Sequence, residues 1–128
     1  MNIIAHRGEW SHESEKNSKK SFIKAIENGF GIETDIRDYC GELIISHDMP
    51  QEKKISLEDF FKLYNKLSIS QNSQALALNI KSDGISEHLN ESIKRHNIQN
   101  YFVFDMSIPD TMTYIKEGFR VYSRMSEL

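Results

Sequence analysis

The sequence predicts an α/β fold built on a parallel sheet. Short apolar segments alternate with amphipathic helical patterns along all 128 residues, and no repeat or low-complexity stretch interrupts them. Uncommon polar residues gather at the ends of successive apolar segments. Such alternation implies right-handed crossovers between parallel strands, in either a doubly wound sheet or a (β/α) barrel of the TIM type.

Six short segments rich in Ile, Leu, Val or aromatic residues are typical of strands. Gly41 separates the second segment from the third, so we expect these two to form a β-hairpin inserted after the second strand. Counted without the hairpin strand, five strands remain. A closed barrel has eight strands and about 250 residues, so we expect a barrel truncated after its fifth strand. The six segments are residues 2–5, 31–37, 42–46, 75–80, 101–104 and 120–122.

Four amphipathic patterns predict the helices. The second pattern opens with Ser56 and Asp59, which are spaced as in a capping box, and the fourth opens at Pro109 and stops at Gly118. The third is expected to bury Leu89. The first three patterns cover residues 18–28, 57–66 and 86–96.

Composition and charge exclude several classes of protein. A net charge of −3 provides no broad basic surface, so we expect no nucleic-acid partner. The one cysteine, Cys40, excludes an intrachain disulfide and is expected to be a solvated loop thiol. No apolar run approaches the ~18 residues of a membrane span. We therefore expect residues 1–128 to form a single soluble, cytoplasmic domain.

Polar residues lie toward the carboxyl ends of the five predicted βα-type strands and of the hairpin strand. In parallel α/β proteins this edge of the sheet is where ligands bind and catalytic groups gather. Polar groups on five independent strands therefore indicate a site. The residues are His6 and Arg7, Glu33 and Asp35, His47 and Asp48, Asn79 and Lys81, and Asp105 and Arg124.

The chemistry of these residue types favours metal-assisted phosphoryl transfer. Glu33 and Asp35 are two apart on a strand and therefore share a face, where their repulsion would be relieved by a hard cation such as Mg²⁺ or Ca²⁺. His6 and His47 are suited to exchanging a proton near neutral pH. Three other histidines, in a loop or on helical patterns, are expected to be ordinary surface or edge residues: His12, His88 and His96.

Two cationic residues at the same edge could clamp phosphate oxygens. Arg7 and Lys81 would do so through charge-assisted hydrogen bonds. An alternative is that Arg7 pairs with Glu33 or Asp35 in a structural ion-pair network. The sequence leaves both interpretations open.

The order of these motifs resembles the signature of the glycerophosphodiester phosphodiesterase family. The resemblance covers about the first fifty residues, while later residues carry it only through the segment that ends at Lys81. The matching motifs are His6-Arg7-Gly8, Asn17-Ser18 followed by Phe22, Glu33-Thr34-Asp35, and His47-Asp48.

The resemblance implies a (β/α) barrel that cleaves a small phosphodiester to a phosphomonoester and an alcohol with Mg²⁺ or Ca²⁺. Asn79 stands where the family has a third metal-binding glutamate, which removes one negative charge. By resemblance, His6 and His47 are the general acid and base, Glu33, Asp35 and Asn79 hold the metal, and Arg7 and Lys81 contact the phosphate.

Three functional hypotheses follow. The first is a metal-dependent phosphodiester hydrolase. The second is a catalytically impaired remnant that binds phosphate or metal, and the third is an α/β module whose strand-end residues serve only ion pairing. The sequence also leaves open a homo-oligomer that completes the barrel.

Overall fold

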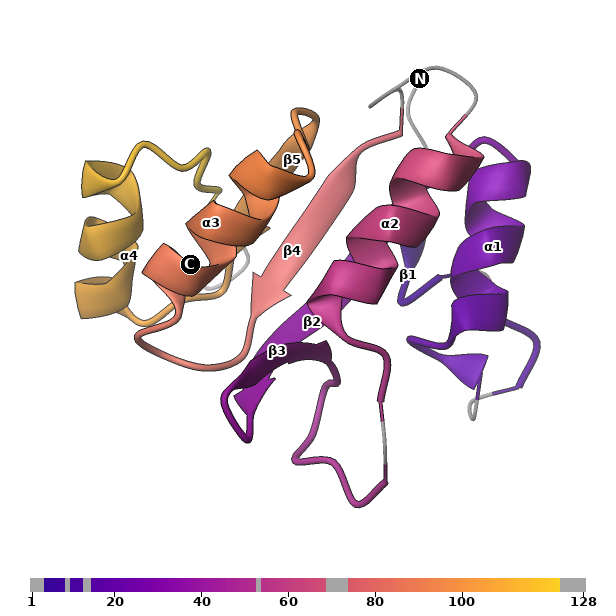
Figure 1. Cartoon of the computed structure of the whole chain (residues 1–128), viewed down its shortest axis with the longest axis horizontal. Coiled ribbons are helices and arrows are strands. Elements are labelled where there is room, and N and C mark those ends of the chain that lie inside the picture. Colours follow the sequence, from indigo (N-terminus) through magenta and orange to yellow (C-terminus); the bar gives the residue numbers. More distant parts are fainter. Residues whose placement is uncertain (1–3, 9, 13–14, 53, 69–73, 123–128) are drawn as a thin grey trace, which may run out of the picture.

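The computed structural model describes residues 4–8, 10–12, 15–52, 54–68 and 74–122. Strands and helices alternate along the chain, with one hairpin strand added (Figure 1). The elements are β1 (Ile4–His6), α1 (Lys19–Glu27), β2 (Gly31–Tyr39), β3 (Glu42–Ile45), α2 (Leu57–Leu67), β4 (Leu76–Ile80), α3 (Ser86–Arg95), β5 (Tyr101–Phe104) and α4 (Ile108–Lys116).

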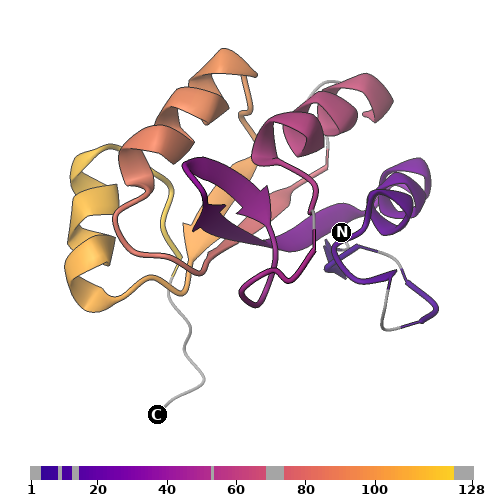
Figure 2. The ribbon, with the colours of Figure 1, turned by 60° about the horizontal axis from the view of Figure 1, so that its bottom comes forward.

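The sheet has the order β1-β2-β4-β5, with all four strands parallel. Each of these four strands thus lies beside the parallel strand that precedes it in the sequence. The hairpin strand β3 pairs only with β2. Figure 2 shows the helices arched over one side of this sheet, as successive right-handed crossovers require. A doubly wound sheet would place helices on both faces. The edge strands β1 and β5 do not pair with each other within the described residues, so the sheet is open there and the expected barrel is not closed.

The predicted hairpin is confirmed. β3 pairs antiparallel with the second half of β2, and Tyr39 lies opposite Glu42 at the last position of the ladder. Cys40 and Gly41 both have positive φ, 51° and 82°, as a two-residue type I′ turn requires. The Cys40 thiol is exposed, as expected.

The predicted ends of the sheet differ from the structure. The strand expected at residues 120–122 is reduced to an isolated parallel bridge between Val103 and Val121. At the other end, β1 begins at Ile4 in the described part of the chain, and residues 2 and 3 lie outside it. Arg124, expected at a strand end, also falls outside the described residues.

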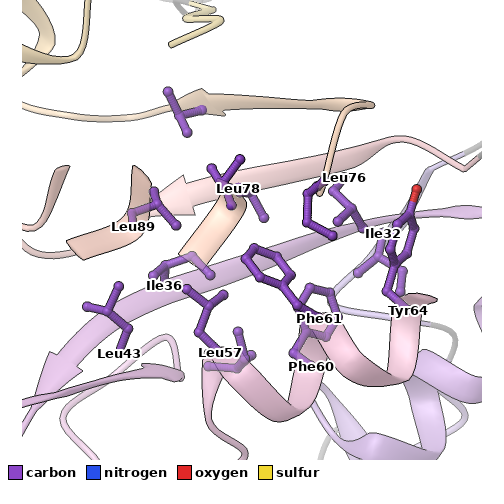
Figure 3. Packing of buried hydrophobic residues seen from close by; sticks show 14 of the residues in the cluster. Ile32, Ile36, Leu43, Leu57, Phe60, Phe61, Tyr64, Leu76, Leu78 and Leu89 are labelled. Carbon is purple, nitrogen blue, oxygen red and sulfur yellow. The ribbon is translucent and has the colours of Figure 1, made fainter. Parts of the chain in front are cut away.

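The helices and the sheet share one hydrophobic cluster. Phe60 of α2 is fully buried and meets Phe22 of α1 edge to face, with ring centroids 4.8 Å apart. Figure 3 shows Phe60, Phe61 and Tyr64 packed toward the strands. Truncating a buried phenylalanine of this kind costs about 3–5 kcal/mol. No helix in the described part of the chain is long and apolar enough to cross a bilayer.

Serine caps begin three of the helices. Ser56 accepts the backbone N–H of Asp59 at the start of α2, which confirms the side-chain-to-backbone half of the predicted capping box. Ser18 and Ser21 form a full capping box at the start of α1, with serine replacing the usual acidic residue. This second cap matters for the site, because Ser21 also contacts the turn after β1.

A polar cluster ties α2 to α3. Glu58 accepts hydrogen bonds from Ser92, Arg95 and His96 at 2.7–2.9 Å. Burial alone would raise the pKa of Glu58, but these three donors lower it to about 2. His96 was expected to be an ordinary surface or edge residue; its side chain is only 11% exposed and holds two helices together.

Candidate active site

Four of the predicted site residues lie on the sheet face that the helices leave uncovered. Along β2, Ile32 and Ile36 pack into the core, so Glu33 and Asp35 project from the opposite face. His6 is the register partner of Glu33, and Asn79 is the register partner of Asp35. Parallel pairing therefore brings the ends of β1 and β4 beside Glu33 and Asp35, which lie before the end of β2.

Asp35 is the centre of this group. Its side chain is 3% exposed, and its Oδ2 atom lies 3.0 Å from Nε of Arg7. Asn17 donates a hydrogen bond to the same oxygen at 2.9 Å. Nζ of Lys81 lies 3.9 Å from the other oxygen, Oδ1. Two positive charges are thereby held beside a buried carboxylate, which is the ion pairing that the sequence left open for Arg7.

The turn that carries Arg7 depends on a glycine. Arg7 and Gly8 have φ values of 55° and 85°. The Arg7 carbonyl accepts hydrogen bonds from the backbone N–H of Asn17 and the hydroxyl of Ser21. A Cβ atom at Gly8 would stand 2.4 Å from Oγ of Ser21. The His-Arg-Gly motif therefore lets the chain pass close to the start of α1 and turn Arg7 toward Asp35.

Asn17 orients Asp35, a role that the sequence patterns did not assign. Its Oδ1 accepts the hydroxyl of Thr34 at 2.6 Å, so its Nδ2 is the atom turned to Asp35. Its φ of 57° is in the left-handed region that asparagine tolerates better than most residues. The sequence singled out Asn17 only as part of the Asn17-Ser18 motif of the resemblance, without a role for its side chain.

His6 lies at the rim of the site. Its side chain is 57% exposed, and Nε2 lies 3.5 Å from Oε2 of Glu33. The indole of Trp10 donates to the His6 carbonyl at 3.1 Å, which holds the backbone at this point. A carboxylate beside one ring nitrogen orients an imidazole for proton exchange.

His47 follows β3 and is paired with its neighbour. Its Nδ1 lies 2.9 Å from Oδ1 of Asp48, and this hydrogen bond holds the pKa of Asp48 below its ordinary value. Arg37 donates from Nη2 to the His47 carbonyl at 2.9 Å. The sequence patterns missed Arg37, although it continues the two-residue spacing of Glu33 and Asp35 along β2.

A hollow of about 710 Å³ brings His47 and Arg7 together. It lies between the turn after β1 and the loop after β3, and its lining also includes Asn17 and Lys16. The described lining does not include His6, which stands instead beside Glu33. The structure therefore divides the predicted residues between this hollow and the adjoining sheet face.

The sheet face offers oxygen ligands for a cation. Among the described residues, no three carboxylate, imidazole or thiol side chains converge as a metal centre. Glu33 and Asp35 nevertheless share their face with Asn79, whose buried Oδ1 atom has no hydrogen-bond partner within the described chain. Two carboxylates and an amide oxygen are the donors that Mg²⁺ and Ca²⁺ prefer. The residues thus fit a hard divalent cation.

Sequence comparison identifies no relative of this chain: no protein-family profile and no curated protein matches it. Structural comparison finds the crystal structure of a glycerophosphodiester phosphodiesterase from Agrobacterium tumefaciens str. C58, with a TM-score of 0.73 and 14% sequence identity. The match covers 94% of this chain and 65% of that enzyme, so the chain spans just under two thirds of its length. The chain therefore shares an α/β parallel-sheet fold with a solved phosphodiesterase.

Proposed function

We propose that this chain is a phosphodiester hydrolase that converts a small glycerophosphodiester-type substrate to a phosphomonoester and an alcohol. The observation that carries the proposal is the position of Arg7, which is anchored on Asp35 and lines the same hollow as His47. The structural likeness to a phosphodiesterase supports the same reaction class. The activity requires an anion site and a proton donor within reach of each other.

The anion site would consist of Arg7 and Lys81. Both cations are partly buried against Asp35, with exposed fractions of 20% and 23%. Partial burial strengthens charge-assisted hydrogen bonds to phosphate oxygens. The chain has a net charge of −3, so a substrate anion must be held by such local charges rather than by a broad field.

The two histidines would divide the proton transfers. One imidazole takes a proton from the attacking hydroxyl or water as the new phosphorus–oxygen bond forms. The other imidazole, protonated, gives its proton to the alcohol oxygen as the old bond breaks. Asp48 can only accept a hydrogen bond when ionised, so Nδ1 of His47 carries a proton and Nε2 is left to exchange one. Glu33 plays the orienting role for His6.

A divalent cation, Mg²⁺ or Ca²⁺, would be held by Glu33, Asp35 and Asn79. When bound, it would neutralise charge that develops on the phosphate oxygens. The charge balance supports this assignment. Glu33, Asp35 and Asp105 bring three negative charges and Arg7 with Lys81 two positive ones, so a divalent cation plus a phosphodiester monoanion leaves the group neutral.

A second candidate function is binding of phosphate or metal without turnover. Asn79 favours it, because an amide in place of a carboxylate weakens a cation site. The Asp35 contacts favour it too, since a cation would have to compete with Arg7 and Lys81 for this carboxylate. This candidate predicts ligand binding with no chemistry.

The test is release of glycerol phosphate from glycerophosphodiesters by the purified chain, with Mg²⁺, with Ca²⁺ and with chelator. His6→Ala and His47→Ala should each abolish release, while His88→Ala, at an exposed position of α3, should not. Cation-dependent release with this pattern would establish the hydrolase. A folded chain that binds glycerol phosphate or Mn²⁺ without turnover would establish the binding function instead, and a chain that does neither would leave only ion pairing.

A further inference from the structure

The amide of Asn79 has an unusual environment at the carboxyl end of β4. The residue is 5% exposed. Its Nδ2 donates to Oδ2 of Asp105 at 3.0 Å, while its Oδ1 has no donor among the described residues. A buried acceptor left without a donor is destabilising, and such atoms in native proteins call for an explanation.

The chemistry of Asp105 decides which way the amide faces. An ionised carboxylate only accepts hydrogen bonds, so it must meet the NH₂ group and not the oxygen. β4 lies between β2 and β5 in the sheet. With its nitrogen turned toward the end of β5, the amide has its oxygen on the β2 side, where Asp35 is the register partner of Asn79.

We propose that Asp105 is a positioning residue that holds Oδ1 of Asn79 toward Asp35 as a ligand for the same divalent cation. The inference rests on the cation of the proposed function. A carboxylate at position 79 would present two equivalent oxygens, whereas an amide presents one ligand atom and one that repels a cation. Asp105 excludes the amide orientation in which Nδ2 of Asn79 would face the cation. Its carboxylate also supplies the negative charge that an amide at position 79 lacks.

The backbone at Asp105 suits a clean substitution. Its φ of 70° lies in the left-handed region, which glycine adopts without strain. Asp105→Gly therefore removes the carboxylate without straining the backbone at this position. Asn79→Asp is nearly isosteric and makes the two terminal atoms of residue 79 equivalent. These two changes can be combined in a double-mutant cycle.

The experiment measures Mn²⁺ affinity by the electron paramagnetic resonance signal of the free ion, at constant ionic strength, for the wild type, Asp105→Gly, Asn79→Asp and the double variant. Mn²⁺ favours the same oxygen donors as Mg²⁺ and Ca²⁺. Asp105→Gly should lower the affinity of the wild type about tenfold, as loss of an orienting partner does. In the Asn79→Asp background the same change should leave affinity unchanged or raise it, because no orientation remains to be fixed.

An equal loss in both backgrounds would show that Asp105 acts only as a nearby charge and would overturn the inference alone. No loss in either background would do the same. Absence of Mn²⁺ binding by the folded wild type would overturn it together with the cation of the proposed function. Glu33→Gln separates these cases, since it should abolish Mn²⁺ binding in every background if the cation site is the proposed one.

Discussion

Arg7, in the turn after β1, and Asp35, in β2, meet with 3.0 Å between Nε and Oδ2 at the centre of the candidate site. The pair joins the turn after β1 to the face of β2 that the helices leave uncovered. It gives the site an anchored cation and gives β1, a short strand, a polar tie to the sheet. The same contact thus serves stability and the proposed anion binding.

Replacing Asp35 with asparagine should destabilise the chain by about 1–3 kcal/mol, because Arg7 and Lys81 then lose the carboxylate that balances them. Their partial exposure keeps the cost below that of a fully buried pair. Urea unfolding measures the change. Asp38→Asn, at an exposed position of the same strand, is the matched control and should stay within about 0.5 kcal/mol of wild type. Equal stability of the two variants would show that the Asp35 contacts are not stabilising.

Replacing Asn17 should expose how much its amide contributes. Asn17→Gly keeps the backbone at φ 57° and removes the hydrogen bonds to Thr34 and Asp35, so a loss of about 1–3 kcal/mol is expected. Asn17→Ala should cost about 1 kcal/mol more, because alanine is strained in this region. Thermal unfolding of both variants gives the two values. A glycine variant as stable as wild type would mean that the side-chain hydrogen bonds of Asn17 make no net contribution to stability.

Gly8 and Gly29 offer a controlled comparison of sterics with backbone strain. Both have positive φ, 85° and 78°, but an added Cβ at Gly8 meets Ser21 while at Gly29 nothing lies within 4 Å. Gly29→Ala should lower the free energy of unfolding by about 1 kcal/mol, because alanine is strained at this positive φ and meets no steric clash. Gly8→Ala should cost clearly more and reduce any phosphate binding through Arg7. Denaturant unfolding of the two variants measures both losses of stability. Similar losses would contradict the close approach of Gly8 to Ser21.

Acid should weaken the α2–α3 connection through Glu58. Its pKa in the folded chain is about 2, against an ordinary value of 4.5, because donors that include His96 outweigh burial. A lowered folded-state pKa stabilises the fold above pH 4.5, and this stabilisation is lost as the pH falls from 4.5 toward 2. Glu58→Gln should therefore lose less stability than wild type over that window.

Urea midpoints measured at several pH values between 5 and 2 test this expectation. Glu15 titrates in the same window, because Lys20 lowers its pKa to about 2. The comparison must therefore be between variants: Glu91→Gln, at an exposed position of α3, should keep the wild-type slope while Glu58→Gln flattens it. An identical dependence of stability on pH for all three chains would show that the hydrogen-bond partners of Glu58 do not lower its pKa in the folded state.

The sequence by itself determined the alternation of elements and most of their bounds. Periodicity of apolar residues predicted the first three helices, start and stop signals at Pro109 and Gly118 predicted the fourth, and Gly41 predicted the hairpin. These signals all depend on neighbours along the chain. It also placed Glu33 and Asp35 on one face, because strand side chains alternate strictly. The strand expected at residues 120–122 did not form beyond one bridge, since pairing depends on a neighbour that local pattern cannot report.

Only the tertiary structure decided which polar groups meet. The sheet order put Asn79 beside Asp35 and Asp105 beside Asn79, contacts between residues 26 to 44 positions apart that no local pattern encodes. It also placed the helices along one side of the parallel sheet, because helix placement follows from strand order. Residue types thus named the chemistry of the site, while long-range pairing set its geometry.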